Sequence, residues 1–71
     1  MQPASKTVVA YWDFYDSDSG RLLEKDRKIH QSAMPSQGAL ITNVPGKPNA
    51  VVRLFKFRGA KDGLPCYDVY V

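Results

Sequence analysis

Two strand-like segments joined by a turn, within residues 50–71, constrain the fold more than any other feature of the chain. Residues 50–58 interleave cations with phenylalanines, and residues 66–71 are rich in tyrosine and valine. Between them, Gly59 and the sequence Lys61-Asp62-Gly63 supply the backbone freedom that a chain reversal requires. The pattern predicts an antiparallel β-hairpin.

A further strand is predicted over residues 6–15, where apolar residues alternate with a mixed set. One face of this strand is wholly apolar and comprises Val8, Ala10, Trp12 and Phe14. Two-residue alternation of this kind is typical of a half-buried strand. We therefore expect this face in the core, with a hydrogen-bond partner for the indole N–H of Trp12. Aspartates and serines predict a turn over residues 16–20, and residues 1–5 are expected to form a flexible arm.

Residues 21–30 admit two interpretations. As a strand, they form the return arm of a hairpin with residues 6–15. As a helix over residues 19–31, they would use Asp18 or Ser19 as a cap and contain strong helix formers. However, Asp26 occupies the position where a helical stripe requires an apolar residue, so the strand is favoured.

The expected fold follows from these segments together with a short strand at residues 39–44. About five strands joined by short loops predict a single all-β domain over residues 1–71, mainly antiparallel and either barrel-like or a strongly bent sheet. The alternative is an α+β fold with residues 19–31 helical. A chain of 71 residues has room for one domain, and its core is thin.

Composition excludes several classes of protein. Hydrophobic residues make up 44% of the chain and charged residues 24%, which is ordinary for a folded domain. The apolar runs are too short to span a membrane, and the N-terminal residues have no signal-peptide core, so we expect a cytoplasmic protein. Cys66 is the single cysteine, so no disulfide forms within one chain. The net charge of +3 permits an acidic partner without requiring one.

Catalytic and metal-binding patterns are weak in this sequence. Cys66 and His30 have no local signature of a nucleophile–base pair, and together they are too few for a zinc site. The aspartates within residues 13–18 lack the spacing of a calcium loop, whose twelfth position counted from Asp16 is Arg27. Phosphate-binding glycine loops are absent. We therefore expect no metal, no cofactor, no small-molecule substrate and no enzymatic activity.

Basic and aromatic residues remain as candidates for a binding surface. If Phe55 and Phe57 point inward, the cations of residues 50–58 share the outer surface with aliphatic neighbours. The expected partner-binding residues are Tyr11, Tyr15, Val52, Leu54, Lys56, Arg58 and Tyr70. Residues 50–58 have two half-apolar faces, which predicts that the core covers this strand on one side and a partner covers it on the other.

Two functions fit this surface. The favoured one is a non-enzymatic interaction module that self-associates through a sheet face and binds another protein, because tyrosine and arginine are typical of interfaces. The alternative is a single-stranded nucleic-acid binder, in which bases stack on the tyrosines and cations hold phosphates. Acidic neighbours dilute the dispersed basic residues, and this favours a protein partner. Cations that are merely solvated on the outer side of an ordinary strand remain the third interpretation.

Overall fold

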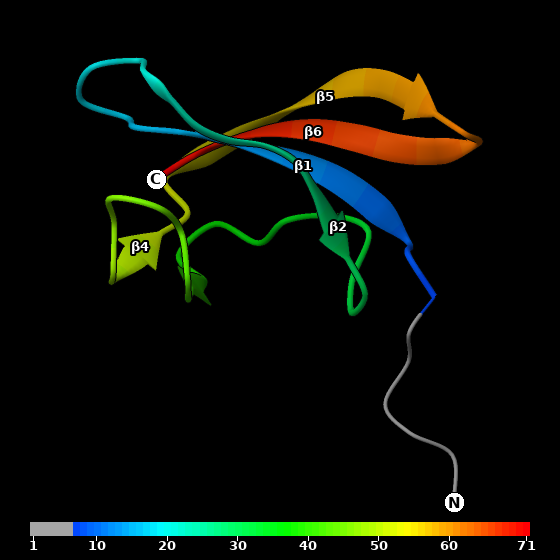
Figure 1. Ribbon diagram of the computed structural model, residues 1–71, viewed down its shortest axis with the longest axis horizontal. Coiled ribbons are helices and arrows are strands. Elements are labelled where there is room, and N and C mark those ends of the chain that lie inside the picture. The colour runs from blue at the N-terminus through cyan, green and yellow to red at the C-terminus, as the bar shows by residue number, and fades with distance from the viewer. Residues whose placement is uncertain (1–6) are drawn as a thin grey trace, which may run out of the picture.

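A computed structural model describes residues 7–71, which form an all-β domain of six strands with no helix (Figure 1). The strands are β1 (Ala10–Tyr15), β2 (Leu22–Ile29), β3 (Leu40–Ile41), β4 (Ala50–Val51), β5 (Leu54–Lys61) and β6 (Leu64–Tyr70). Four of them make a sheet in the order β2-β1-β6-β5, and β3 and β4 make a separate ribbon. The all-β prediction is confirmed, and the α+β alternative is wrong. The predicted arm, residues 1–5, lies outside the described residues.

The first hairpin pairs β1 with β2. Ala10 is the partner of Ile29, and Tyr15 is the partner of Leu22. In the turn, the Gly20 N–H donates to the backbone carbonyl of Asp16 over 2.7 Å, and the Ser19 hydroxyl accepts from the Arg21 N–H. The pairing is irregular near Asp26, which has a positive φ of 53°. Residues 21–30 are therefore a strand, as favoured, but a bulged one.

The second hairpin pairs β5 with β6 through a two-residue turn. Asp62 and Gly63 have φ values of 53° and 76°, and two consecutive positive φ values are the mark of the turns that suit the twist of a hairpin. Beside this hairpin, β6 also pairs with β1 in parallel. This central parallel pair joins the two hairpins into one sheet, and it is the pairing that local sequence patterns do not reveal.

The predicted continuous strand over residues 50–58 is divided in two. The backbone of Val52 pairs with the preceding loop: its N–H donates to the Ala39 carbonyl (2.9 Å), and its carbonyl accepts from Gly38 (2.7 Å). One residue later, the Arg53 N–H donates to the Tyr70 carbonyl (2.8 Å). The chain thus leaves the ribbon at Val52 and joins the four-stranded sheet at Arg53, which separates β4 from β5.

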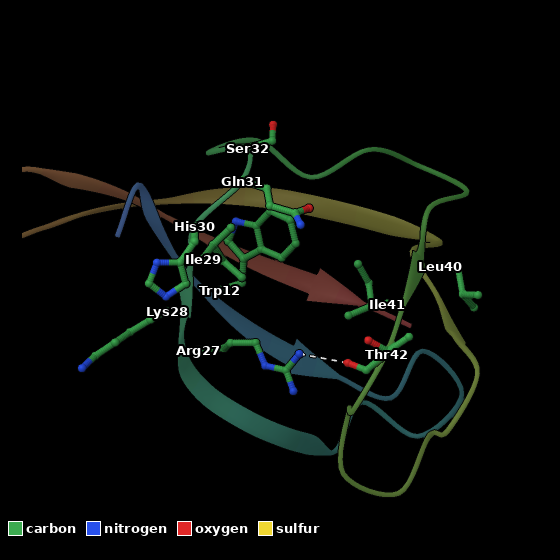
Figure 2. Close-up of a pocket in the computed structure, with 10 residues that line it drawn as sticks. All are labelled: Trp12, Arg27, Lys28, Ile29, His30, Gln31, Ser32, Leu40, Ile41 and Thr42. Carbon is green, nitrogen blue, oxygen red and sulfur yellow. Dashed lines mark hydrogen bonds between the residues drawn. The ribbon is translucent and has the colours of Figure 1, made fainter. Parts of the chain in front are cut away.

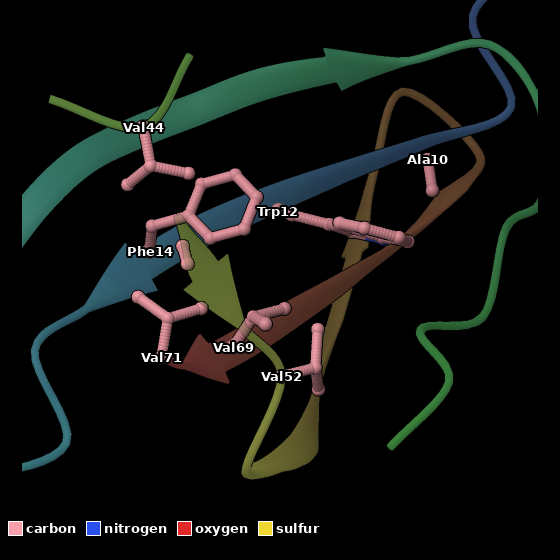
Figure 3. Close-up of a cluster of buried hydrophobic side chains, with 8 residues drawn as sticks. Ala10, Trp12, Phe14, Val44, Val52, Val69 and Val71 are labelled. Atoms are coloured by element: carbon pink, nitrogen blue, oxygen red, sulfur yellow. The ribbon is translucent and has the colours of Figure 1, made fainter. Parts of the chain in front are cut away.

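The core lies between one face of the sheet and the segment that covers it, residues 30–53 (Figure 1). We call this covered side the inner face and the opposite side the outer face. Buried apolar side chains from the sheet and the covering segment meet there: Ala10, Trp12, Phe14, Val44, Ala50, Val52, Val69 and Val71 (Figure 3). The Trp12 indole N–H donates to the Ala33 carbonyl over 3.0 Å, as predicted. Residues 7–71 include no helix that has the length and apolar character needed to cross a membrane.

Candidate functional site

Strand alternation places six of the seven predicted binding residues together on the outer face. Residues of β1 that alternate with the buried ones point outward, and the parallel register sets Tyr15 beside Tyr70. The antiparallel register sets Leu54 opposite Tyr70 and Lys56 opposite Asp68. The six residues on this face are Tyr11, Tyr15, Leu54, Lys56, Arg58 and Tyr70.

Val52 does not belong to this surface. Its side chain is 1% exposed and packs in the core, so its expected place beside Leu54 and Lys56 was wrong. The reason is the change of partner between Val52 and Arg53, where the chain passes from the ribbon to the sheet. A simple alternation count carried across this point assigns Val52 to the wrong face.

An ion-pair network centred on Arg58 occupies the middle of the outer face. The guanidinium contacts Asp68 Oδ1 at 2.9 Å and Asp13 Oδ1 at 3.2 Å, and it lies 3.9 Å from Asp26. Lys61 Nζ lies 3.0 Å from the second oxygen of Asp26. We call these five residues the outer-face charge cluster. Asp13 is its most buried member, at 4% exposure, and it also accepts the Asp26 N–H over 2.8 Å.

Contacts within the charge cluster shift the pKa values of Arg58 and Asp26 toward their charged forms. Burial acts to lower the pKa of Arg58, but the carboxylates of Asp13 and Asp68 outweigh it and raise that pKa above the usual value. A hydrogen bond from Lys61 lowers the pKa of Asp26. Three carboxylates surround the two cations of the cluster, which leaves Arg58 poorly placed to bind a phosphate.

The tyrosines of the outer face contact other side chains of the same chain. Tyr15 and Tyr70 stack with ring centres 5.1 Å apart and an interplanar angle of 20°. Lys56 Nζ lies 5.9 Å from the centre of the Tyr70 ring, and Lys61 Nζ lies 5.1 Å from that of Tyr11. Burial, followed by the nearby carboxylates of Asp68 and Asp13, raises the pKa of Tyr15. These rings form a packed polar surface and do not present a row of bare faces for bases.

The edge of the sheet at β5 exposes large apolar side chains on both faces. Leu54 on the outer face is 49% exposed, and Phe57 on the inner face is 64% exposed. Phe57 packs edge-to-face against Tyr67 with ring centres 5.6 Å apart, but the rest of its ring is uncovered. Phe55, also on the inner face, is partly buried against the core. Phe55 and Phe57 point inward, as the predicted outer surface required.

Phe57 is the residue of this surface that the sequence did not single out. Alternation correctly assigns it to the inner face, and a large aromatic residue on that face is normally read as core. Its exposure arises because residues 30–53 cover the inner face only in part, while the β5–β6 hairpin projects beyond them (Figure 1). The expected core cover on one side of residues 50–58 therefore reaches Phe55 but not Phe57.

Two surface grooves flank β2. The first, of about 320 Å³, lies between residues 27–32 and 40–42 and includes Trp12 in its lining. Arg27 reaches toward Thr42 there, whereas Lys28 and His30 point away from Trp12 and Ile41 (Figure 2). Its cations do not converge, so the groove is not built to hold an anion.

The second groove, of about 390 Å³, lies between residues 16–23 and 45–47. Lys47 Nζ lies 2.8 Å from Asp16 at this groove. Hydrogen bonds from Lys47 and then Ser19 lower the pKa of Asp16 to about 2. The groove is thus bordered by an ion pair that ties the covering segment to the first turn.

The two residues considered for catalysis, His30 and Cys66, contact different parts of the chain. His30 Nδ1 lies 3.2 Å from the Thr7 carbonyl, whereas the Cys66 thiol points to the Leu64 carbonyl at 3.9 Å. The aspartates of residues 13–18 serve the charge cluster and the turn. Across residues 7–71, no group of three or more histidine, cysteine, aspartate or glutamate side chains is arranged to hold a metal ion.

Comparisons with protein-family models, with curated proteins and with solved structures find no match to this chain. A functional proposal therefore rests on the geometry of its surfaces.

Proposed function

We propose that this chain is a small protein-interaction module and that the edge strand β5 is its binding surface. The observation that carries the proposal is the pair Leu54 and Phe57, which are 49% and 64% exposed on opposite faces of the same strand. Exposed apolar residues gathered at one place on a small domain mark a site of association. Here they flank a strand edge, so a partner that packs along β5 would cover both at once.

The mode of binding that fits this edge is the addition of a strand. In the described sheet, β5 is hydrogen-bonded to β6 alone, and its other side has no strand beside it. An extended polypeptide can pair with the free backbone groups of such an edge, while its side chains pack on both faces of the sheet. Leu54 and Phe57 supply the apolar contacts that fix the added strand.

Self-association is the second candidate, because two copies that meet edge to edge would each cover the other's Leu54 and Phe57. Binding of single-stranded nucleic acid has less support. Arg58 contacts Asp68 and Asp13, and Tyr15 and Tyr70 stack on each other, so both groups would have to exchange internal contacts for a base or a phosphate.

A selection with a random decapeptide library tests the proposed surface without assuming the chemistry of the partner. We expect peptides that bind the wild-type chain and lose binding to the double variant Leu54→Ser, Phe57→Ser. Met34→Ser is the matched control, because Met34 is 57% exposed on the covering segment and not on β5. Peptides that bind the wild type and the double variant equally, or no selected peptides at all, would contradict the proposal.

Sedimentation velocity of the same three proteins separates the second candidate from the first. Self-association through β5 predicts a concentration-dependent dimer for the wild type and Met34→Ser, and a monomer for the double variant. A monomer in all three proteins would remove self-association and leave a different protein as the partner.

A further inference from the structure

We infer that the β5 edge selects an extended acidic partner, a strand in which acidic and apolar residues alternate. The inference rests on the proposed function and specifies the chemistry of the chain that β5 binds.

The charges of β5 are the first step. Its ionisable side chains are all cations, namely Lys56, Arg58 and Lys61. The carboxylates that offset them lie inward from the edge, on β1, β2 and β6. The outermost strand of the sheet is therefore positive, while the compensating negative charge lies behind it. A strand added at this edge meets the cations first.

Lys56 is the cation most available to a partner. Asp68 lies opposite it in the register, but that carboxylate already contacts Arg58 at 2.9 Å. No ion pair of Lys56 occurs within residues 7–71, and its ammonium lies over the Tyr70 ring. A carboxylate on the added strand, directly beside Lys56 on the outer face, would form a cross-strand pair of opposite charge.

On the inner face, the environment beside β5 favours apolar residues in the partner. Phe55 and Phe57 alternate with Lys56 along β5, and both pack edge-to-face against Tyr67, with ring centres 6.0 and 5.6 Å away. A partner residue beside these rings would be removed from water, so an apolar side chain is favoured there. Because successive residues of a strand point to opposite faces, the partner must alternate acidic and apolar residues.

A second copy of this chain fits the edge less well. When two β5 strands pair antiparallel about an axis through Phe57, Lys56 faces Arg58 of the second copy. An axis through Arg58 sets that arginine opposite itself. Like charges placed directly opposite destabilise a strand pair. The two registers with the greatest overlap thus disfavour self-pairing and favour an acidic strand.

Three synthetic decapeptides of simple composition test the inference by isothermal titration calorimetry. The first alternates Glu and Val, the second alternates Lys and Val, and the third has five Glu followed by five Val. We expect the alternating Glu–Val peptide to bind the wild-type chain more tightly than both others. Equal binding of the Glu–Val and Lys–Val peptides, or tighter binding of the blocked peptide, would overturn the inference.

Charge reversal at Lys56 gives the sharper test. Lys56→Glu is expected to weaken the binding of the alternating Glu–Val peptide by roughly three- to fivefold, the effect of one cross-strand charge pair. The same change is expected to strengthen the binding of the Lys–Val peptide. Lys28→Glu is the matched control, because Lys28 is an exposed cation of the other edge strand, β2. An equal loss in both variants would show that net charge, and not the β5 edge, governs binding. Lys56→Gln should give an intermediate loss if the reversed variant is poorly folded.

The two proposals fail in different ways. If library peptides depend on Leu54 and Phe57 but carry no acidic alternation, the charge inference is wrong and the binding surface stands. If the Glu–Val peptide binds the Leu54→Ser, Phe57→Ser variant with the same affinity as the wild type, the proposal that β5 is the binding surface is wrong.

Discussion

The two edge strands of the sheet, β2 and β5, have the same length but very different surroundings. Each is eight residues long, and together they flank the central pair β1 and β6. The inner side of β2 lies along residues 40–47: Arg27 donates to the carbonyls of Thr42 and Asn43, and Leu23 packs against the core. On the β5 side, Gln37 Nε2 donates to the Arg53 carbonyl over 2.9 Å, one residue before the strand begins, and the core reaches Phe55 but leaves Phe57 64% exposed.

Charge distinguishes the two edges as well. β2 carries the mixed sequence Glu-Lys-Asp-Arg-Lys, in which Arg27 pairs with Glu24 at 2.7 Å. β5 carries cations alone, and both strands contain a bulge. Bulges and charges are the usual means of protecting an edge from unwanted pairing. The comparison teaches that β2 is covered along its inner side and exposes one large apolar residue at its start, Leu22 (45% exposed), whereas β5 exposes Leu54 on one face and Phe57 on the other. We propose that this combination suits β5 to the selective addition of a strand.

The largest expected effect on stability is at Val52, where the chain passes from the ribbon to the four-stranded sheet. Val52→Ser should lower the free energy of unfolding by about 2–3 kcal/mol, because it removes a fully buried aliphatic side chain and buries a hydroxyl. Urea denaturation followed by tryptophan fluorescence measures this loss. The neighbouring Val51→Ser, at a side chain that is 42% exposed, should change stability by less than about 0.5 kcal/mol. Equal losses in the two variants would mean that the core does not end where the structure places it.

The next largest effect on stability is at Arg27, whose hydrogen bonds hold residues 42 and 43 against β2. Arg27→Met should reduce stability by about 1–2 kcal/mol, because two loop carbonyls lose a charged donor and the Phe14 ring loses the guanidinium that lies over it, while an unbranched side chain is kept. Denaturation and amide exchange in residues 40–47 report the change. Lys25→Met serves as the control, since Lys25 is exposed on the same strand. If the two variants behave alike, Arg27 does not hold the cover on β2.

Acid should lower the stability of the fold through two carboxylates, Asp16 in the first turn and Asp26 on the outer face. Hydrogen bonds from Lys47 and then Ser19 hold the pKa of Asp16 at about 2, and a hydrogen bond from Lys61 lowers that of Asp26. Because both folded-state values lie below the unfolded value of about 4, their contribution is fully present above pH 4 and is lost as the pH falls toward 2. Thermal unfolding between pH 7 and pH 2 measures this loss.

Substitution separates the two acid-sensitive contacts. Asp16→Asn should flatten part of the decline in unfolding temperature below pH 4, while it keeps a side chain suited to the turn. Asp18→Asn, at an exposed residue of the same turn, is the control and should leave the decline unchanged. A decline that is the same in all three proteins would assign acid sensitivity to other groups.

The smallest expected effect on stability is at β5 itself. Leu54→Ser and Phe57→Ser should each change the free energy of unfolding by less than about 0.5–1 kcal/mol, because both side chains are largely exposed. Urea denaturation measures the two changes. A loss as large as that of Val52→Ser would mean that these residues stabilise the fold, and would remove the reason to treat them as a binding surface.

Local patterns in the sequence predicted most of the elements. Alternation located β1 and its buried face, the position of Asp26 argued against a helix at residues 21–30, and Asp62-Gly63 marked the hairpin turn. Each of these depends on residues close together in the chain. Alternation also placed Leu54 and Lys56 on the outer face, where the structure has them, and their role in binding stays a prediction.

The remaining features depend on long-range geometry. The break at Val52 arises because residues 38 and 39 pair with its backbone, and no residue at positions 50–58 signals it. The exposure of Phe57 depends on how far residues 30–53 extend over the sheet. The capture of Arg58 by Asp13 and Asp68 requires the parallel pairing of β1 and β6, which a local reading does not give. Because of these three features, β5 is a partly covered edge strand and not the second half of one continuous strand over residues 50–58.

Amide hydrogen exchange of the wild-type chain, measured by NMR with and without the alternating Glu–Val decapeptide, tests the central claim most directly. A strand added to β5 would protect alternate amides of Leu54–Phe57, those that point away from β6, and would leave β2 unchanged. Protection along β2, or no new protection in β5 when the peptide is bound, would contradict the claim that β5 is the binding edge of this protein.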